Sequence, residues 1–84
     1  MTDPELVAAW DQVHAANEPL GWQVGRPYFH DERDTWEQYA WDRNERPKAG
    51  KRSREWTAIG PTEVECVRTM AYCLRELAAG RWPK

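Results

Sequence analysis

The amino-acid sequence predicts an α+β fold of the order helix, three-stranded antiparallel sheet, helix (αβββα), with both helices on one face of the sheet. Two segments, one toward each end of the chain, repeat apolar residues at the spacing of an amphipathic helix. The segments between them show the alternation of apolar and polar residues that is typical of strands. A chain of 84 residues allows one domain, over residues 1–84.

The first helix is predicted to begin near the amino terminus. Thr2 is followed three residues later by Glu5, and Pro4 lies in the first turn, which are two signals of a helix start. Pro19 and Gly21 predict its end. The apolar stripe of this helix consists of Leu6, Val7, Trp10, Val13 and His14. We expect His14 to be a core residue whose hydrogen bonds are satisfied.

A short edge strand is predicted over residues 22–30, because Trp22 and Val24 alternate with polar or small residues until Pro27 interrupts the pattern. Residues 30–34 predict a charged turn. The second strand, residues 35–42, carries aromatic side chains on both faces, with Trp36, Gln38 and Ala40 on one and Glu37, Tyr39 and Trp41 on the other. We therefore expect one aromatic set to face away from the helices.

The third strand, residues 53–59, alternates in the same way and is stopped by Gly60 and Pro61. A second helix follows, since Thr62 with Glu65 forms a capping box and Gly80 is suited to end the helix. Its broad apolar face includes two cysteines that are too far apart on one helix to form a disulfide with each other: Val64, Cys66, Val67, Met70, Ala71, Cys73, Leu74, Leu77 and Ala78.

Charge is distributed unevenly along the chain. The net charge is −2, which by itself predicts no affinity for nucleic acid or for anionic membranes. Residues 43–54, however, connect the second and third strands and carry six basic side chains and one acidic one: Arg43, Arg46, Lys48, Lys51, Arg52 and Arg54, with Glu45. A hairpin loop of this length is either functional or disordered in most compact domains. It is therefore interpreted either as a phosphate-binding loop or as a solvated loop whose charge balances the acidic body.

The first functional hypothesis is a non-catalytic binding module whose basic hairpin loop contacts nucleic acid or another polyanion. Tyr39 and Trp41 would assist by stacking if they face outward, and the docking would be electrostatic with little base readout. The alternative is a small protein-interaction or regulatory protein that acts through the aromatic sheet face or by homodimerisation. The excess of nine Arg over three Lys suggests a bacterial or phage source.

Catalytic and metal signatures are weak. His30 lies beside Asp31, Glu32 and Asp34, but without a second histidine at suitable spacing a solvated turn is the better interpretation. We predict no enzyme activity, no cofactor, no metal site and no small-molecule substrate. Apolar runs are too short for a membrane span and the first residues do not resemble a secretory signal, so we expect no membrane partner and a cytoplasmic location.

The order of helix, three strands and helix resembles that of double-stranded RNA-binding domains. Those domains carry a lysine cluster at the start of the final helix, where this chain has Thr62, Glu63, Val64 and Glu65. Two carboxylates there would repel phosphate, so the resemblance extends to the order of elements and does not imply the same mode of RNA binding.

Overall fold

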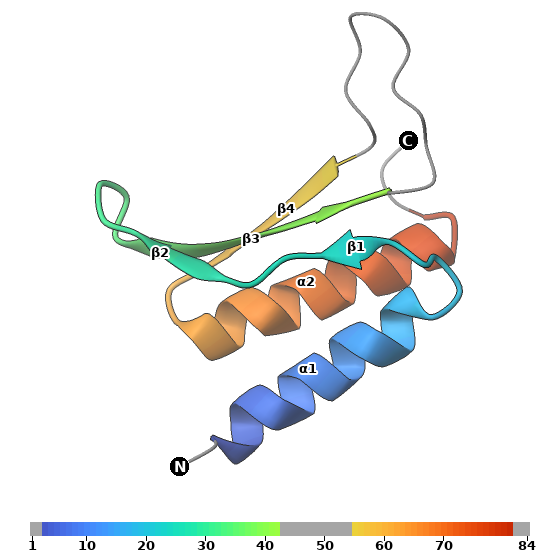
Figure 1. Cartoon of the computed structure of the whole chain (residues 1–84), viewed down its shortest axis with the longest axis horizontal. Helices are drawn as coiled ribbons and strands as arrows, with labels where there is room; N and C mark the ends of the chain where they lie inside the picture. The colour runs from blue at the N-terminus through green and yellow to red at the C-terminus, as the bar shows by residue number, and fades with distance from the viewer. Residues whose placement is uncertain (1–2, 43–54, 82–84) are drawn as a thin grey trace, which may run out of the picture.

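The computed structural model describes residues 3–42 and 55–81 and shows both helices on the same side of an antiparallel sheet, with the second helix against the sheet and the first helix packed on the second (Figure 1). The predicted α+β class and the order of helix, sheet and helix are confirmed. The elements are α1 (Pro4–Asn17), β1 (Gln23–Val24), β2 (Tyr28–His30), β3 (Thr35–Trp41), β4 (Glu55–Gly60) and α2 (Glu63–Ala78).

The sheet is built around β3. β4 pairs with β3 along one edge, from Trp36 opposite Gly60 to Trp41 opposite Glu55. β1 and β2 pair with the other edge, so the single strand predicted over residues 22–30 is in fact two short strands on the same side of β3 (Figure 1).

The segment that joins β1 to β2 contains one residue more than the stretch of β3 that it faces. The register runs from Val24 opposite Ala40 to Tyr28 opposite Glu37, so β1 and β2 use one residue more than β3 over this stretch. Pro27 has no N–H to donate, whereas Gly25 still donates to Tyr39 O at 2.8 Å. The extra residue is therefore accommodated as a bulge between Gly25 and Tyr28.

Helix α1 begins at a different cap from the one the sequence suggests. Asp3 is the N-cap and accepts a hydrogen bond from Glu5 N at 2.9 Å, while Pro4 occupies the first helical position. The expected core stripe is also partly wrong, because Val7 and His14 are exposed. The buried residues are Ala9 and Val13, with Leu6, Trp10 and Ala16 packed beside them.

The rotation of α1 about its own axis explains why Val7 and His14 are exposed and Ala9 is buried. His14 stacks against Trp10 on the solvent side, with ring centroids 5.8 Å apart, and so is no core histidine. Small Ala9 instead faces α2, where it permits close approach of the two helices. After α1, Asn17 ties the chain to Trp22 through two hydrogen bonds: its Nδ2 donates to Trp22 O at 2.7 Å and its Oδ1 accepts from Trp22 N at 3.0 Å.

Helix α2 begins at Thr62 and ends before Gly80 as predicted, but only the Thr62 half of the capping box is formed, because Glu65 Oε1 accepts from Arg68 Nη1 at 3.2 Å. Thr62 accepts from Glu65 N at 3.1 Å. At the other end Gly80 has a φ of +76°, and Gly80 N and Arg81 N donate to the carbonyls of Leu77 and Glu76 at 3.1 and 3.0 Å. The helix buries Cys66, Val67, Met70, Ala71, Cys73 and Leu74.

Small residues on the strands allow α2 to lie close to the sheet. Ala40 and Ala58 face the helices and are almost fully buried in the same core as Met70 and Leu74. Gly60 is closer still: a Cβ added there would lie 2.6 Å from Cys66 N. Gly60 therefore belongs to β4 and permits close packing, in addition to preceding the turn.

Candidate functional site

The face of the sheet that points away from the helices is the candidate site, and we call it the outer sheet face. It is formed by alternate residues of the strands, namely Gln23, Tyr28, His30, Thr35, Glu37, Tyr39, Trp41, Glu55, Thr57 and Ile59. Their strand neighbours Gln38, Ala40 and Ala58 point toward the helices and are buried. Because side chains alternate along a strand, one register assigns the whole set to one face.

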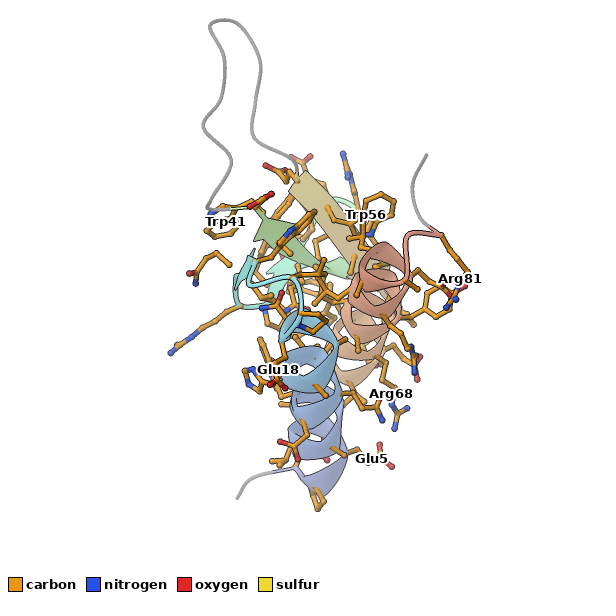
Figure 2. The ribbon with its side chains drawn as sticks, turned by 90° about the vertical axis from the view of Figure 1, so that its right-hand side faces the viewer. Glu5, Glu18, Trp41, Trp56, Arg68 and Arg81 are labelled. Atoms are coloured by element: carbon orange, nitrogen blue, oxygen red, sulfur yellow. The ribbon has the colours of Figure 1, made fainter. Side chains whose placement is uncertain are left out.

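Tyr39 and Trp41, the two aromatic residues singled out as partner contacts, both lie on this face. Trp41 is opposite Glu55 and is 37% exposed, and Tyr39 is opposite Thr57 and half-buried. Trp41 and Trp56 extend in opposite directions from the adjoining ends of β3 and β4 (Figure 2). Within the described part of the chain, neither helix covers the outer sheet face (Figure 1).

Tyr28, Trp41 and Ile59 are exposed apolar side chains on this face, while Val7, Phe29 and Tyr72 are exposed elsewhere among the described residues. Tyr28 is 41% exposed and Ile59 is 49% exposed, and together with Trp41 they surround the central positions of β3. Aromatic side chains with a polar tip are common at binding surfaces, where they contribute large contact area at a small cost in side-chain entropy. The outer sheet face therefore presents both aromatic and aliphatic side chains in exposed positions.

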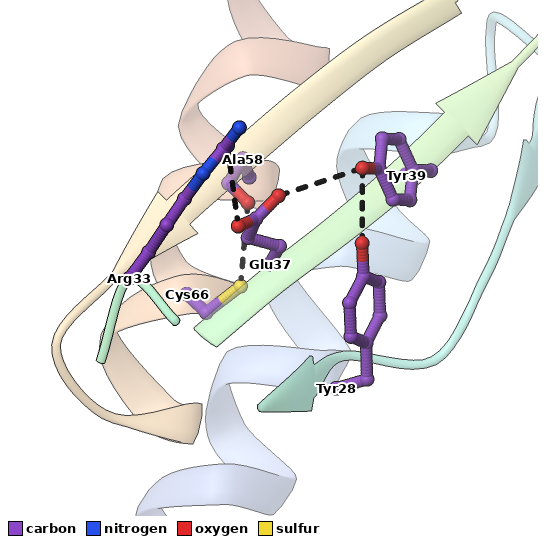
Figure 3. A network of polar contacts seen from close by, with 6 residues as sticks. All are labelled: Tyr28, Arg33, Glu37, Tyr39, Ala58 and Cys66. Atoms are coloured by element: carbon purple, nitrogen blue, oxygen red, sulfur yellow. Dashed lines mark hydrogen bonds and ion pairs between the residues drawn. The ribbon is translucent and has the colours of Figure 1, made fainter. Parts of the chain in front are cut away.

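A network of polar contacts crosses the middle of the face (Figure 3). Tyr28 OH donates to Tyr39 OH at 2.9 Å, and Tyr39 OH donates to Glu37 Oε1 at 3.4 Å. The rings of Tyr28 and Tyr39 are stacked, with centroids 5.9 Å apart. Arg33, in the turn before β3, completes the network with its Nη1 at 3.5 Å from Glu37 Oε2.

The network shifts the acidity of Tyr28. Its hydrogen bond to Tyr39, followed by loss of solvation and the charge of Glu37, raises the pKa of Tyr28 to about 12. The phenol is therefore a neutral donor throughout the physiological range. The hydrogen bond and the ring stacking hold Tyr28 and Tyr39 together as an aromatic pair beside the carboxylate of Glu37.

Glu37 is the least expected member of the site, because it is a carboxylate only 2% exposed on a face that points to solvent. Neighbouring strands explain its burial: Tyr28 lies opposite on β2 and Ile59 opposite on β4, while Arg33 reaches it from the turn. Glu37 Oε2 has no hydrogen-bond partner within the described residues, and the same is true of the buried atoms His30 Nδ1 and Thr35 Oγ1. Hydrogen-bonding capacity is thus left over from Glu37 at the centre of the face to His30 and Thr35 at one end.

His30 differs from its expected place. It is the last residue of β2 and half-buried opposite Thr35, whereas the exposed turn consists of residues 31–34. Within residues 3–42 and 55–81 no three His, Cys, Asp or Glu residues are grouped so that they could hold a metal ion. His30 is accordingly a member of the outer sheet face and stands apart from the acidic turn.

The predicted phosphate-binding residues lie outside the described residues. They are Arg43, Arg46, Lys48, Lys51, Arg52 and Arg54. What the structure does describe is where that segment is attached: β3 ends at Trp41, β4 begins at Glu55, and these two residues are paired. The basic segment therefore leaves and re-enters the fold at the Trp41 end of the outer sheet face.

The sequence predicts Tyr39 and Trp41 as contact residues, whereas Tyr28, Arg33 and Glu37 are members of the site that the structure adds. Strand alternation places Glu37 on the same face as Tyr39. A charged residue in the middle of an aromatic strand is a sequence signal that could have identified Glu37 as a site residue. No signal in the sequence marks Tyr28 or Arg33 as members of the site, because their approach to Glu37 depends on the bulge after Gly25 and on the turn before β3.

A groove between the two helices and two buried thiols are less suited as functional sites. A groove of about 380 Å³ lies between the carboxyl-terminal halves of α1 and α2, but alanines make up most of its lining and it carries one charged group, Arg75. Cys66 and Cys73 are buried free thiols, as expected for core residues. Burial raises the pKa of the Cys66 thiol to about 11 and also raises that of Cys73, which makes both poor nucleophiles at neutral pH.

None of the helices in the described part of the chain is long and apolar enough to cross a membrane. Comparison of the chain with protein-family models, with curated proteins and with solved structures finds no match. The side chains of the outer sheet face and the charge of the segment joined to it are therefore the basis on which function is inferred.

Proposed function

We propose that this protein is a non-catalytic module that binds single-stranded nucleic acid. The basic segment 43–54 would contact phosphates, and Trp41 and Tyr39 would stack on bases. The observation that carries the proposal is the position of Trp41: it lies on the uncovered sheet face and is separated by one residue from Arg43, the first cation of the segment. The first cation of the segment and an exposed aromatic side chain are thus close together in the sequence.

Electrostatics support binding through this segment alone. Six basic residues and one acidic residue within 43–54 give a local charge of +5, while the rest of the chain is acidic. Counterion release from phosphates depends on the charges that contact the backbone, so a local cluster suffices even when the net charge is −2. Arg side chains in the cluster suit bidentate contacts with phosphate oxygens.

Aromatic side chains favour single strands over duplexes. Bases in a duplex present only their edges, whereas unpaired bases can stack on a Trp or Tyr ring, which contributes roughly 1–3 kcal/mol per base. Trp41 is 37% exposed and Tyr28 41% exposed, so each offers ring area for such a contact. Arg beside aromatic residues is a usual combination in surfaces that bind single strands.

A second candidate is a protein interface on the same face. Ile59 is 49% exposed beside the buried Glu37, and an aliphatic side chain there contributes to protein contact but little to base stacking. In that case the face would bind a second copy of the chain or a partner protein, and the basic segment would form a polar rim.

Charge reversal tests the first candidate. Lys51→Glu with Arg52→Glu is expected to weaken binding of a labelled single-stranded oligonucleotide and to lower the magnitude of the salt slope by about 1.4. The matched control is Arg68→Glu with Arg75→Glu, which changes net charge equally on exposed positions of α2, in the helix layer. Equal loss in both variants would indicate a net-charge effect and would refute binding by the basic segment.

A second pair of variants tests stacking. Trp41→Ala is expected to weaken binding roughly 5- to 100-fold. Tyr72→Ala removes an aromatic side chain that is 51% exposed on α2, and should leave binding unchanged. If instead Trp41→Ala leaves oligonucleotide binding intact but abolishes self-association in sedimentation or light-scattering measurements, the protein interface is supported.

A further inference from the structure

We propose that Glu37 binds the Watson–Crick edge of a guanine, so that the outer sheet face selects guanine within a bound single strand. This inference rests on the proposed function and deepens it. The feature behind it is the buried carboxylate of Glu37, which is 2% exposed at the centre of the face.

The hydrogen bonds of Glu37 are incomplete. Oε1 accepts from Tyr39 OH at 3.4 Å, which is long for a hydrogen bond between an O–H and a carboxylate. Oε2 has no hydrogen bond within the described residues, although Arg33 Nη1 lies 3.5 Å away. A buried acceptor without a donor is destabilising, so a ligand that brings N–H groups to both oxygens is favoured.

Among the bases, guanine best matches a carboxylate. An ionised carboxylate only accepts hydrogen bonds, and its two oxygens can take two parallel N–H donors. Guanine presents N1–H and the N2 amino group side by side. Adenine and cytosine place a ring nitrogen acceptor beside their one amino group, and uracil and thymine flank N3–H with two carbonyls, so a carboxylate facing these edges meets at least one repelling lone pair.

Arg33 occupies the position that the base would take. A guanidinium group and the N1–C2–N2 edge of guanine present the same kind of N–H fork to a carboxylate. Arg33 is 64% exposed and holds Glu37 by a single 3.5 Å contact, which makes it a weak and readily displaced partner. Once displaced, its guanidinium is free to bind a phosphate of the same strand.

Neighbouring side chains complete the match. Tyr28 lies directly opposite Glu37, is 41% exposed, and is held by stacking on Tyr39, so it supplies a ring on which the base can rest. Thr35 lies two residues from Glu37 on the same face, and its buried hydroxyl has no partner within the described residues. That hydroxyl can donate to O6 of guanine, the acceptor next to N1–H.

The test compares thymine-rich single-stranded oligonucleotides of about 12 nucleotides that differ at one central base, guanine, inosine or adenine, by fluorescence anisotropy at fixed salt. Inosine lacks only the N2 amino group. We expect guanine to bind roughly 10- to 100-fold more tightly than inosine, because the lost donor leaves a charged acceptor unpaired. Because this change is in the ligand, no altered protein has to fold.

Glu37→Gln keeps the size of the side chain and is expected to equalise guanine and inosine, while Glu18→Gln, at an exposed position at the end of α1, should keep the preference. Equal binding of guanine and inosine by the unaltered protein would overturn the role of Glu37 and leave the proposed function standing. Absence of binding to any oligonucleotide at low salt would overturn both.

Discussion

Replacing Gly60 by alanine is expected to destabilise the fold, because helix α2 lies too close to β4 for a side chain. An alanine Cβ at this position would lie 2.6 Å from Cys66 N, 2.9 Å from Glu65 C and 3.0 Å from Cys66 Cα. All three atoms belong to the backbone of α2, so no side chain can rotate away. Either the helix or the end of the strand must move.

The cost can be bounded from these contacts. Adding a methyl group to a packed region that must shift costs roughly 1–3 kcal/mol. Part of this is offset, since alanine reduces the entropy of the unfolded chain by about 0.4–1 kcal/mol relative to glycine. The expected net loss is about 1–2 kcal/mol, which for a domain of this size lowers Tm by roughly 4–16 °C.

Thermal unfolding followed by circular dichroism measures the effect. Gly25→Ala is the matched control, because Gly25 also adjoins β3 and its added Cβ would lie 3.4 Å from the nearest atom, in ordinary contact. We expect the control to change Tm by only a few degrees. A Gly60→Ala protein as stable as the unaltered chain would show that α2 does not approach the sheet as described, and would refute the assignment of the covered face.

Two solution measurements test the environments of single groups. Burial raises the pKa of Cys66 to about 11 and also raises that of Cys73. Neither thiol should therefore react with a disulfide reagent at pH 8 until denaturant unfolds the chain. Fast reaction of the native protein would contradict the burial of these thiols. Folding raises the pKa of Tyr28 from 10.0 to about 12, so its contribution to stability is complete below pH 10 and lost as the pH rises from 10 to 12. Ultraviolet absorbance should show one tyrosine titrating late, and Tyr39→Phe should return it toward 10; a late titration that persists in Tyr39→Phe would contradict the hydrogen bond as its main cause.

Local signals in the sequence were sufficient for much of the fold. The cap formed by Thr62 with Glu65 N and the left-handed Gly80 depend on residues within a few positions of each other, so their chemistry can be recognised without knowing the tertiary structure. Alternation along β3 likewise predicted that Tyr39 and Trp41 share a face, which the register with β4 shows.

Other features depended on long-range packing and were missed. The phase of the α1 stripe is set by contact with α2, so Val7 and His14 turned out to be exposed while Ala9 is buried. The bulge after Gly25 requires knowledge of two registers at once. Burial of Glu37 depends on side chains from other segments, and strand alternation alone assigned it only a face.

The basic segment was assigned from charge alone, and its six cations lie outside the described residues. Its attachment between Trp41 and Glu55 links it to the outer sheet face, and this connection follows from the pairing of β3 and β4. The proposal for nucleic-acid binding therefore combines a sequence feature with a structural one, and each has its own variant and control.

Salt dependence of single-strand binding tests the central proposal most directly. Fluorescence anisotropy with a labelled single-stranded oligonucleotide, over a series of salt concentrations, gives the slope of log K against log salt. If four or five phosphates of the single strand are neutralised by the basic segment, the slope is about −2.8 to −3.5. No binding at low salt, or binding that does not weaken as salt increases, would contradict the proposal and favour a protein partner for the outer sheet face.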